Sequence, residues 1–433
     1  MPTPAPLPAL DDLRVAVIGL GYVGLPLAVE FGKQRETVGF DLNAARVAAL
    51  RTGHDSTGEV EDANLAAAQH LRYASDLTEI ADCNVYIVAV PTPIDQHRQP
   101  NLDPLLSASK MVGSVLQRGD IVVFESTVYP GATEEDCLPL VAAESGLTLN
   151  TGFYAGYSPE RINPGDKTRP LPKIVKVTSG STPEAAVLID ALYGTIITAG
   201  THLAPSIRVA EASKVIENTQ RDVSIALINE LSIIFSHLDI DTNAVLDAAA
   251  TKWNFNRLSP GLVGGHCIGV DPYYLVHKSI AAGHIPDIIR MAREINDGMA
   301  RHAVTLLIKK MIQNGARVKG GRVLLLGLTF KQNCADIRNT KVLDMLGDLQ
   351  SYGLDVDMFD PWANPAELRD AYGVEMARVI PAPAGDYDAV ILAVSHDNLI
   401  EMGAAGLRAY LAPNGVFFDM KAVFGQDESD LRL

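Results

Sequence analysis

A short hydrophobic segment, Val15–Ile18, runs directly into the glycine-rich turn GLGYVG and then into a helix-like stretch. A continuous β-branched run of this length is typical of a strand buried on both faces of a parallel sheet. Three more such runs follow, separated by stretches with helical periodicity, and this alternation predicts a doubly wound α/β domain. The strand candidates are 36–43, 83–93 and 119–131, and the helix candidates are 43–51, 103–116 and 132–144. Two further strand candidates, 151–156 and 174–178, extend the predicted sheet towards residue 200.

The same series of strands returns after Gly320. The segments GRVLLLGLTFK, LDVDMFDP, YDAVILAVSHD and NGVFFDMKA match the first series in order, with Asp360 placed as Asp41 is. The turn in GLTFK lacks the three spaced glycines, so a dinucleotide pyrophosphate fits poorly there. Between the two series the pattern is helical at 207–238 and 287–314, with a Gly- and Pro-rich loop between them. The sequence therefore predicts two Rossmann-like doubly wound parallel-sheet domains, 1–200 and 315–433, joined by a central helical domain, 201–314.

Length, charge and cysteine content limit the number of domains and the classes of partner that the chain can have. A chain of 433 residues suits two or three domains. The net charge of −16 argues against binding to nucleic acid or to a membrane surface. The four cysteines are scattered, and no apolar run approaches the ~18 residues of a membrane-spanning helix. The start, MPTPAPLPALDD, does not resemble a signal peptide, so we expect a cytoplasmic protein.

The first glycine turn is a candidate dinucleotide site. In this pattern Gly19 allows the tight turn, Gly21 allows a phosphate to approach the backbone, and Gly24 allows helix and strand to pack closely. The helix would present its N–H groups and positive end to the pyrophosphate. Asp41, at the end of the next strand candidate, can accept both ribose hydroxyls and would repel a 2′-phosphate, which favours NAD over NADP. Arg46 either covers the adenosine side or is a solvated helix arginine.

Two threonines follow strand candidates of the same sheet. Thr92 in VPTP and Thr127 in ESTV lie at carboxyl ends of strands, where such sheets bind ligands. Each hydroxyl is therefore a candidate cofactor contact, and the structural alternative for each is the cap of the following helix.

A second glycine-rich loop, GLVGGHCIGVD, surrounds Cys267 and ends at Asp271. Its glycines allow close approach of the backbone to a ligand. Cys267 is either a buried small hydrophobic residue or a nucleophile that adds to a carbonyl carbon. Zinc held by His266 and Cys267 is disfavoured, because no second ligand pair has metal-site spacing. We therefore expect no metal.

Further polar residues are candidates with structural alternatives. Lys214, Asn218 and Arg221 share one helix face, and a polar stripe of this kind is usually just the solvated face of a helix. Glu160 and Arg161 lie in the Pro-bounded turn of YSPERINPG, which could be an ordinary polar turn. A third group comprises Phe330, Lys331 and Arg338. It lies at the ligand edge of the second predicted sheet, where cations suit phosphate oxygens. The alternative is that these cations face only water.

A nicotinamide site and a thiol nucleophile together indicate one chemistry. Removal of a hydride converts an alcohol to an aldehyde, and addition of the thiol gives a thiohemiacetal. A second hydride can leave from that carbon to form a thioester, which water hydrolyses to the acid. The thiol is useful because an unhydrated aldehyde has no hydroxyl-bearing carbon from which a second hydride can leave.

Over essentially its full length, the chain resembles the UDP-glucose/GDP-mannose dehydrogenase family. The motifs are GLGYVGLPLA, VPTP, SPER, K-x-x-x-N, GGHC-x-x-x-D and FK-x-x-x-x-D-x-R. The forms GGHCIGVDPYYL and SPERINPG are most similar to the branch that oxidises UDP-N-acetylhexosamines, such as UDP-N-acetylglucosamine or UDP-N-acetylgalactosamine, at C6. The resemblance implies a homodimer whose chain has an NAD domain, a central helical domain and a UDP-binding domain. It also implies that the product is used in the biosynthesis of a surface polysaccharide (capsule or O-antigen).

The resemblance also implies roles for individual residues. Cys267 would be the nucleophile, Lys214 a proton donor or acceptor or a stabiliser of the oxyanion, and Asn218 a ligand of that oxygen. The remaining catalytic candidates would order the lysine and the water: Asp271, Thr127 and Glu160. The implied NAD contacts are Gly19, Gly21, Tyr22, Val23, Gly24, Asp41, Arg46, Thr92, Thr127 and Arg338. The implied substrate contacts are Glu160, Arg161, Ile162, Lys214, Asn218, Arg221, Arg257, Gly264, Phe330 and Lys331.

Three departures bear on the substrate. UDP-glucose enzymes carry a lysine where this chain has Val270 and a glutamate where it has Pro164, which argues against UDP-glucose. Arg257 and Ser259 stand where relatives place an arginine directly before Pro-Gly, so Arg257 would have to substitute for it. The alternatives to UDP-N-acetylglucosamine or -galactosamine are UDP-N-acetylmannosamine and UDP-glucose. Outside this substrate class, the alternatives are a single-step β-hydroxyacid dehydrogenase and a non-catalytic NAD-binding redox sensor with Cys267 as its thiol.

Overall fold

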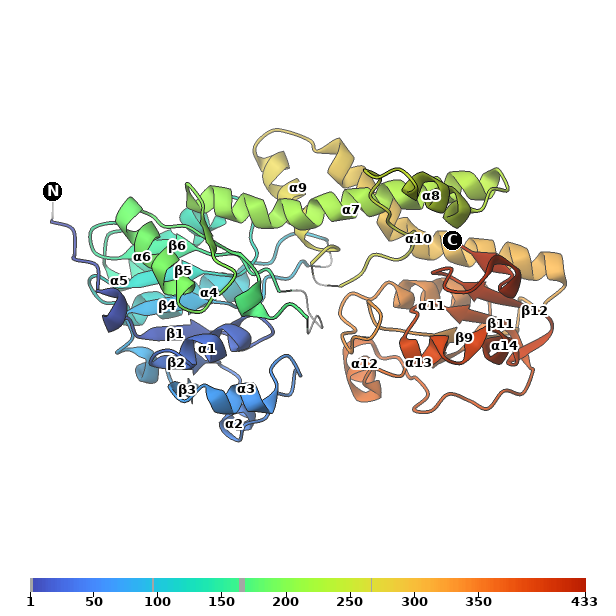
Figure 1. Cartoon of the computed structure of the whole chain (residues 1–433), viewed down its shortest axis with the longest axis horizontal. Helices are drawn as coiled ribbons and strands as arrows, with labels where there is room; N and C mark the ends of the chain where they lie inside the picture. The colour runs from blue at the N-terminus through green and yellow to red at the C-terminus, as the bar shows by residue number, and fades with distance from the viewer. Residues whose placement is uncertain (1–2, 96, 163–167, 266) are drawn as a thin grey trace. The chain divides into compact units, whose positions relative to one another are not determined.

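The structure is a computed structural model that describes residues 3–95, 97–162, 168–265 and 267–433 (Figure 1). His266 and Pro164, which the sequence analysis singles out, lie outside these ranges. The chain forms two compact units. The N-terminal unit comprises Met1–Glu217 and Tyr273–His284, and the C-terminal unit comprises Asn218–Pro272 and Ile285–Leu433.

The N-terminal unit is built on a six-stranded parallel sheet in the order β3-β2-β1-β4-β5-β6. This is the order of a dinucleotide-binding doubly wound sheet. The strands are β1 Val15–Ile18, β2 Thr37–Phe40, β3 Leu71–Ala74, β4 Val85–Val88, β5 Ile121–Phe124 and β6 Tyr154–Tyr157. The helices are α1 Gly24–Gly32, α2 Ala44–Arg51, α3 Asp62–Ala67, α4 Asp103–Val115, α5 Leu138–Ser145 and α6 Pro183–Gly194.

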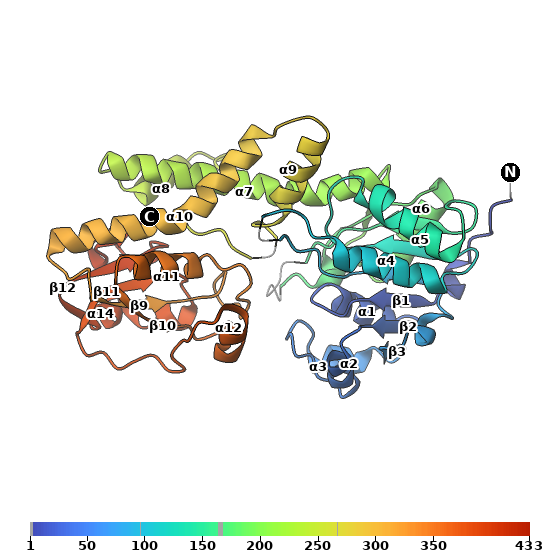
Figure 2. The same cartoon turned by 180° about the vertical axis from the view of Figure 1, so that it is seen from behind.

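Helices cover both faces of this sheet. Side chains of β1, β4 and β5 that point to one face pack with α1 and α6 in a single core. Helices α4 and α5 pack against each other, and Figure 2 shows them in front of the sheet. Burial on both faces explains why the central strands are continuously hydrophobic rather than alternating.

One predicted strand forms but does not belong to the predicted sheet. Segment 174–178 does form a strand, β7 (Lys176–Thr178), but it pairs with β8 (Thr201–Leu203) in a separate two-stranded sheet. Parallel addition to β6 would require a crossover connection, usually a helix. The described residues between β6 and β7 contain only the short 3-10 turn Leu171–Lys173.

The C-terminal unit carries a five-stranded parallel sheet in the order β10-β9-β11-β12-β13. Its strands are β9 Arg322–Leu326, β10 Asp355–Phe359, β11 Tyr387–Leu392, β12 Leu411–Asp419 and β13 Leu431–Arg432. Its helices in this region are α11 Val342–Ser351, α12 Pro365–Tyr372, α13 Asp397–Ile400 and α14 Gly403–Arg408. The repeated strand series predicted from the sequence is thereby confirmed.

The two faces of this second sheet bury alternate strand residues. Val323 and Leu325 of β9 pack with α10 and α11, whereas Leu324 and Leu326 pack with α13 and α14. The long helices are α7 Ile207–His237 and α10 Asp287–Asn314, close to the predicted ranges. The segment between them is more ordered than its glycines and prolines indicate, because it also forms α8 Thr242–Ala250 and α9 Asp271–Ala281.

The boundary between the two units falls within α7, after Glu217. Among the described residues, no helix is both long and apolar enough to span a membrane.

Candidate active site

The glycine turn between β1 and α1 has the geometry that a bound pyrophosphate needs. Gly19 has φ +92°, and a Cβ there would lie 2.7 Å from the carbonyl oxygen of Ala89. A Cβ on Gly24 would collide with the carbonyl oxygen of Gly19, so the third glycine is required for packing. A Cβ on Gly21 would meet nothing within 4 Å, which leaves open space where a phosphate would approach. Tyr22 and Val23 complete the turn and are half-buried.

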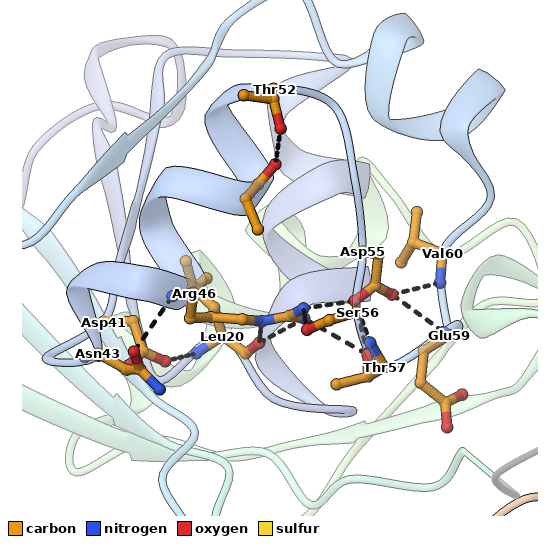
Figure 3. Close-up of polar contacts among 11 residues, drawn as sticks. Leu20, Asp41, Asn43, Arg46, Thr52, Asp55, Ser56, Thr57, Glu59 and Val60 are labelled. Atoms are coloured by element: carbon orange, nitrogen blue, oxygen red, sulfur yellow. Dashed lines mark hydrogen bonds and ion pairs between the residues drawn. The ribbon is translucent and has the colours of Figure 1, made fainter. Parts of the chain in front are cut away.

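Asp41 follows β2 directly and is tied to this turn (Figure 3). Its Oδ2 accepts the N–H of Leu20 at 2.9 Å and its Oδ1 accepts the N–H of Asn43 at 2.8 Å. The side chain stays half-buried, so the carboxylate retains lone pairs for two ribose hydroxyls.

Arg46 lies against the glycine turn and is held by acceptors of the protein. Its side chain is 8 % exposed and forms an ion pair of 2.6 Å with Asp55 (Figure 3). Its Nε and Nη2 also donate to the carbonyl oxygen of Leu20, at 3.1 and 3.0 Å. The alternative of a solvated helix arginine is therefore wrong, and Arg46 acts on the turn itself.

Thr92 and Thr127 lie side by side at the carboxyl edge of the first sheet. The hydroxyl of Thr92 donates to the carbonyl oxygen of Thr127 at 2.7 Å, and the hydroxyl of Tyr274 donates to the carbonyl of Thr92 at 2.8 Å. Neither threonine is a helix cap: Leu102 and Ala132 occupy the N-cap positions of the next helical segments. Both threonines remain half-buried at the edge where a ligand would bind.

The turn after β6 buries its glutamate. Glu160 is 3 % exposed, accepts the N–H of Ile162, and lies 3.8 Å from Nζ of Lys214. Arg161 donates to the carbonyl oxygen of Val175 at 2.9 Å and pairs with Glu217 at 2.7 Å. An ordinary polar turn is thus wrong for Glu160, and Ile162 packs against the core.

A buried group that no sequence pattern indicates supports this turn. Nζ of Lys176 contacts Oε2 of Glu125 at 2.5 Å and donates to the carbonyl oxygen of Pro159 at 2.8 Å, while Tyr193 donates to Oε1 of Glu125 at 2.6 Å. Lys176 and Glu125 are 2 % and 1 % exposed. A buried pair of this kind positions the residue before Glu160, but a lone lysine in a strand gives no sequence signal of such a partner.

Helix α7 carries three of the predicted residues, with different exposure. Lys214 and Asn218 are 4 % and 8 % exposed, so they do not belong to a solvated face, whereas Arg221 is exposed. Within the C-terminal unit, Nδ2 of Asn218 donates to Oδ2 of Asp271 at 2.6 Å. Asp271 begins α9, directly after the Cys267 loop, and its N–H donates to the carbonyl oxygen of Cys267 at 2.8 Å.

The Cys267 loop is fixed at its other end by a buried polar network that sequence reasoning also missed. Asn229 of α7 accepts the N–H of Gly261 at 2.8 Å and donates to its carbonyl oxygen at 3.1 Å. Asn229 also donates to Asn296 of α10, which in turn donates to Asp222 at 2.7 Å. Arg293 pairs with Asp222 at 2.6 Å, so charge inside the network is compensated.

The glycines of this loop lie against the carboxyl edge of the second sheet. A Cβ on Gly264 would be 2.7 Å from the carbonyl oxygen of Asn339, and a Cβ on Gly265 would be 2.8 Å from the ring of Phe330. Lys331 follows Phe330, with its Nζ 5.6 Å from that ring. The structure therefore brings Gly264 and Phe330, two predicted substrate contacts, to one place.

Two predicted arginines have acidic partners instead. Arg338 forms a bidentate pair with Asp336, with distances of 2.6 to 3.1 Å. Arg257 pairs with Asp247 at 2.6 Å and donates to Ser259 at 3.2 Å, and it is exposed. A ligand contact by either arginine would have to compete with these ion pairs.

Burial separates Cys267 from the other thiols. Burial raises the pKa of Cys83 to about 11 and that of Cys137 to about 12, so both stay protonated at neutral pH. Cys334 is buried as well, whereas Cys267 is partly exposed. Cys267 is thus the cysteine with access to a ligand.

Comparison with known proteins assigns the chain to a family along nearly its whole length. Models of the UDP-glucose/GDP-mannose dehydrogenase family match at 13–197 (NAD binding domain), 208–298 (central domain) and 324–426 (UDP binding domain). A UDP-N-acetyl-D-glucosamine 6-dehydrogenase of Pseudomonas aeruginosa is 57% identical over 98% of this chain and 100% of its own length. One of Salmonella typhi is 54% identical over 98% and 99%.

A solved structure shows the same fold. The UDP-D-ManNAc dehydrogenase of Pyrococcus horikoshii superposes with a TM-score of 0.87 at 27% identity, covering 97% of this chain and 98% of that chain. The open glycine turn with Asp41 fits NAD, as the matched NAD binding domain requires. The chain therefore belongs to the UDP-glucose/GDP-mannose dehydrogenase family and is an NAD-dependent nucleotide-sugar oxidoreductase.

Proposed function

We propose that this protein oxidises C6 of a UDP-N-acetylhexosamine, foremost UDP-N-acetylglucosamine, to the uronic acid in two NAD-dependent steps. Relatives at 57% and 54% identity are named for UDP-N-acetylglucosamine, and Val270 stands where UDP-glucose enzymes carry a lysine. The observation that carries the mechanism is the partly exposed Cys267 in a loop anchored at both ends.

Cys267 supplies the covalent step. Its thiolate forms an S–C6 bond with the aldehyde, and the carbonyl oxygen becomes an oxyanion that takes a proton to give a thiohemiacetal. When bound, NAD supplies the hydride acceptor, once for the alcohol and once for the thiohemiacetal. Water then breaks the S–C6 bond of the thioester, which releases the carboxylic acid and restores the thiol.

The polar residues would control charge and water. The Lys214 ammonium would stabilise the oxyanion or exchange a proton with it, and Asn218 would donate to the same oxygen. Asp271 holds the Asn218 amide at 2.6 Å, which orients that donor. Glu160 and Thr127 would position the hydrolytic water. Gly264, Phe330 and Lys331 would hold the UDP-sugar, with Arg161, Ile162, Arg221 and Arg257 as further proposed contacts. Arg338 would reach the NAD.

Assembly and biological role are part of the proposal. The three-domain division at 1–200, 201–314 and 315–433 would give a central helical dimer domain. Large apolar side chains that the C-terminal unit leaves exposed on α7, α10 and beside α8 support a homodimer: Leu227, Ile234, Trp253 and Ile288. We place the enzyme in the cytoplasm, where its product would enter surface polysaccharide biosynthesis.

The test is a substrate panel with purified protein. UDP-N-acetylglucosamine should be oxidised fastest among UDP-glucose and the UDP-activated N-acetylglucosamine, -galactosamine and -mannosamine, with about two NADH formed per sugar. About one NADH per substrate would indicate a single-step dehydrogenase, and NAD binding without turnover would indicate a redox sensor. A different preferred sugar would correct the substrate.

A pair of cysteine variants tests the nucleophile. Cys267→Ala should bind NAD but form no acid, because no thiohemiacetal can form, whereas Cys83→Ala should keep the activity of the wild type. Normal acid formation by Cys267→Ala would refute the mechanism.

A further inference from the structure

The loop after α2 closes over Arg46 through a buried carboxylate. Besides the ion pair with Asp55, Nη1 of Arg46 donates to Ser56 at 3.0 Å, and Nη2 lies 3.4 Å from the hydroxyl of Thr57 (Figure 3). Each guanidinium nitrogen thus has a protein acceptor, because Nε and Nη2 also donate to Leu20. The charge of Arg46 is neutralised inside the protein.

Asp55 is built to stay ionised in this position. Its side chain is 1 % exposed, and its Oδ2 accepts the N–H groups of Glu59 and Val60, both at 2.9 Å. Its Oδ1 accepts the hydroxyl of Thr57 at 2.7 Å and the N–H of the same residue at 2.9 Å. Burial alone would raise the pKa of Asp55, but these hydrogen bonds outweigh it and hold the pKa below its usual value.

Leu20 connects this ion pair to the ribose carboxylate. Its N–H donates to Asp41 at 2.9 Å, and its carbonyl oxygen accepts Arg46 at 3.0 Å. Arg46 and the carboxylate that would hold the ribose therefore bind the two backbone groups of one residue, Leu20. In dinucleotide sites of this kind, a nearby arginine is what accommodates the 2′-phosphate of NADP.

We infer that Asp55 is a specificity-determining residue for the dinucleotide: it engages Arg46 in an internal ion pair and so withholds that cation from a 2′-phosphate. Exclusion of NADP then has two parts. Asp41 repels the phosphate, and Asp55 removes the positive charge that would compensate for it. The inference rests on the proposed placement of the ribose at Asp41.

Binding measurements on the purified full chain test this directly. We would titrate NAD and NADP calorimetrically into the wild type, Asp55→Asn, Arg46→Gln and the double variant. Asp55→Asn should tighten NADP binding about tenfold, the worth of one charge-assisted contact, and change NAD binding much less. The double variant should lose this gain, because the gain requires the arginine.

Arg46→Gln gives a second readout that does not depend on how the loop tolerates Asp55→Asn. It leaves Asp55 as an unpaired carboxylate, so NADP should bind even more weakly relative to NAD. Glu30→Gln on α1 is the matched control, because it breaks the ion pair with Lys33 and changes the net charge by the same amount as Asp55→Asn. It should leave the ratio of the two affinities unchanged.

Each outcome has a distinct meaning. If Arg46 and Asp55 merely hold the loop, every variant weakens both dinucleotides equally, and the inference is overturned. A gain in NADP binding that persists without Arg46 also overturns it. Asp41→Asn separates the two proposals: if it changes neither affinity, the ribose placement fails, and if it alone changes the ratio, only the role of Asp55 fails.

Discussion

Asp41 follows β2 of the first sheet and Asp360 follows β10 of the second, and each accepts the N–H of a leucine in the turn after the neighbouring strand. From there the two sites diverge. Asp41 is half-buried and otherwise accepts only the Asn43 N–H among the hydrogen bonds described above. Its lone pairs face a turn in which a Cβ on Gly21 would still have room.

Both carboxylate oxygens of Asp360 accept several hydrogen bonds from the protein. Asp360 also accepts the N–H groups of Thr329, Trp362 and Ala363, and Nε2 of His396 lies 3.0 Å from its Oδ2. The N–H of Asn333 donates to Nδ1 of His396, so we assign the proton of this imidazole to Nε2, which donates to the carboxylate. Both side chains of this pair are fully buried.

The comparison shows why the first strand-end carboxylate keeps lone pairs for a ligand, whereas the second has only protein partners. His396 follows β11, the position at which the first sheet has the residues after β4. Its imidazole donates to the carboxylate of Asp360, which a ribose would need as its acceptor. Thr329 stands where the first turn has Gly21, so the pyrophosphate approach is also closed. The second sheet keeps the topology of a dinucleotide domain without its ligand chemistry.

Replacing Asp360 should have the largest effect. Asp360→Ala leaves four backbone N–H groups and His396 without their acceptor, and orphaned buried donors cost about 1–3 kcal/mol each. With partial relaxation we expect the free energy of unfolding to fall by about 3–5 kcal/mol. Urea unfolding measures this loss, and Asp41→Ala, with its half-buried side chain, should lose about 1 kcal/mol. Equal losses in the free energy of unfolding for the two variants would contradict the structural role assigned to Asp360 alone.

The glycine turn should respond in binding rather than in stability. Gly21→Ala places a methyl group in the open space of the turn, so NAD affinity should fall about tenfold or more while the unfolding midpoint stays unchanged. Gly194→Ala on α6, where a Cβ also meets nothing within 4 Å, is the control and should leave both quantities unchanged. Unimpaired NAD binding by Gly21→Ala would place the pyrophosphate elsewhere.

Much of this architecture follows from the sequence because its signals are local. Continuous β-branched runs predict β1, β2, β4 and β5 within a few residues, and the repeated series predicts the second sheet. Strand β7 is misassigned because periodicity indicates a strand but not its partner. The helices α8 and α9 are missed because glycines and prolines around them suggest a loop.

The site residues also divide into those that a local pattern indicates and those that depend on partners distant in the sequence. Glycine spacing and a strand-end carboxylate indicate the dinucleotide turn, since both signals lie within one short segment. The partners that set the environment are far apart in sequence. Asp222 and Arg293 are 71 residues apart, and Glu125 and Lys176 are 51 apart. No pattern in one sequence connects such pairs, so the burial of Glu160 and the anchoring of the Cys267 loop emerge only from the fold.

The smallest expected effect concerns pH. Acidification should change the stability contributed by two buried carboxyl groups, one in each unit, in opposite directions. Burial would raise the pKa of Asp360, but the hydrogen bonds it accepts hold it at about 2, so its stabilising contribution is present above about pH 4 and disappears towards pH 2. Asp120, before β5, has its pKa raised by burial to about 6. Its contribution is present below about pH 4 and is lost as the pH rises through 6.

The matched asparagine variants should therefore diverge. At pH 7, Asp120→Asn should raise the Tm by about 2–4 °C because it no longer buries a charge, and this gain should vanish near pH 4. Asp360→Asn should lower the Tm at pH 7, and its deficit should shrink only below about pH 4. Calorimetric scans from pH 3 to 8 distinguish the two. A shared sign would contradict the opposite pKa shifts assigned to the two buried carboxyl groups.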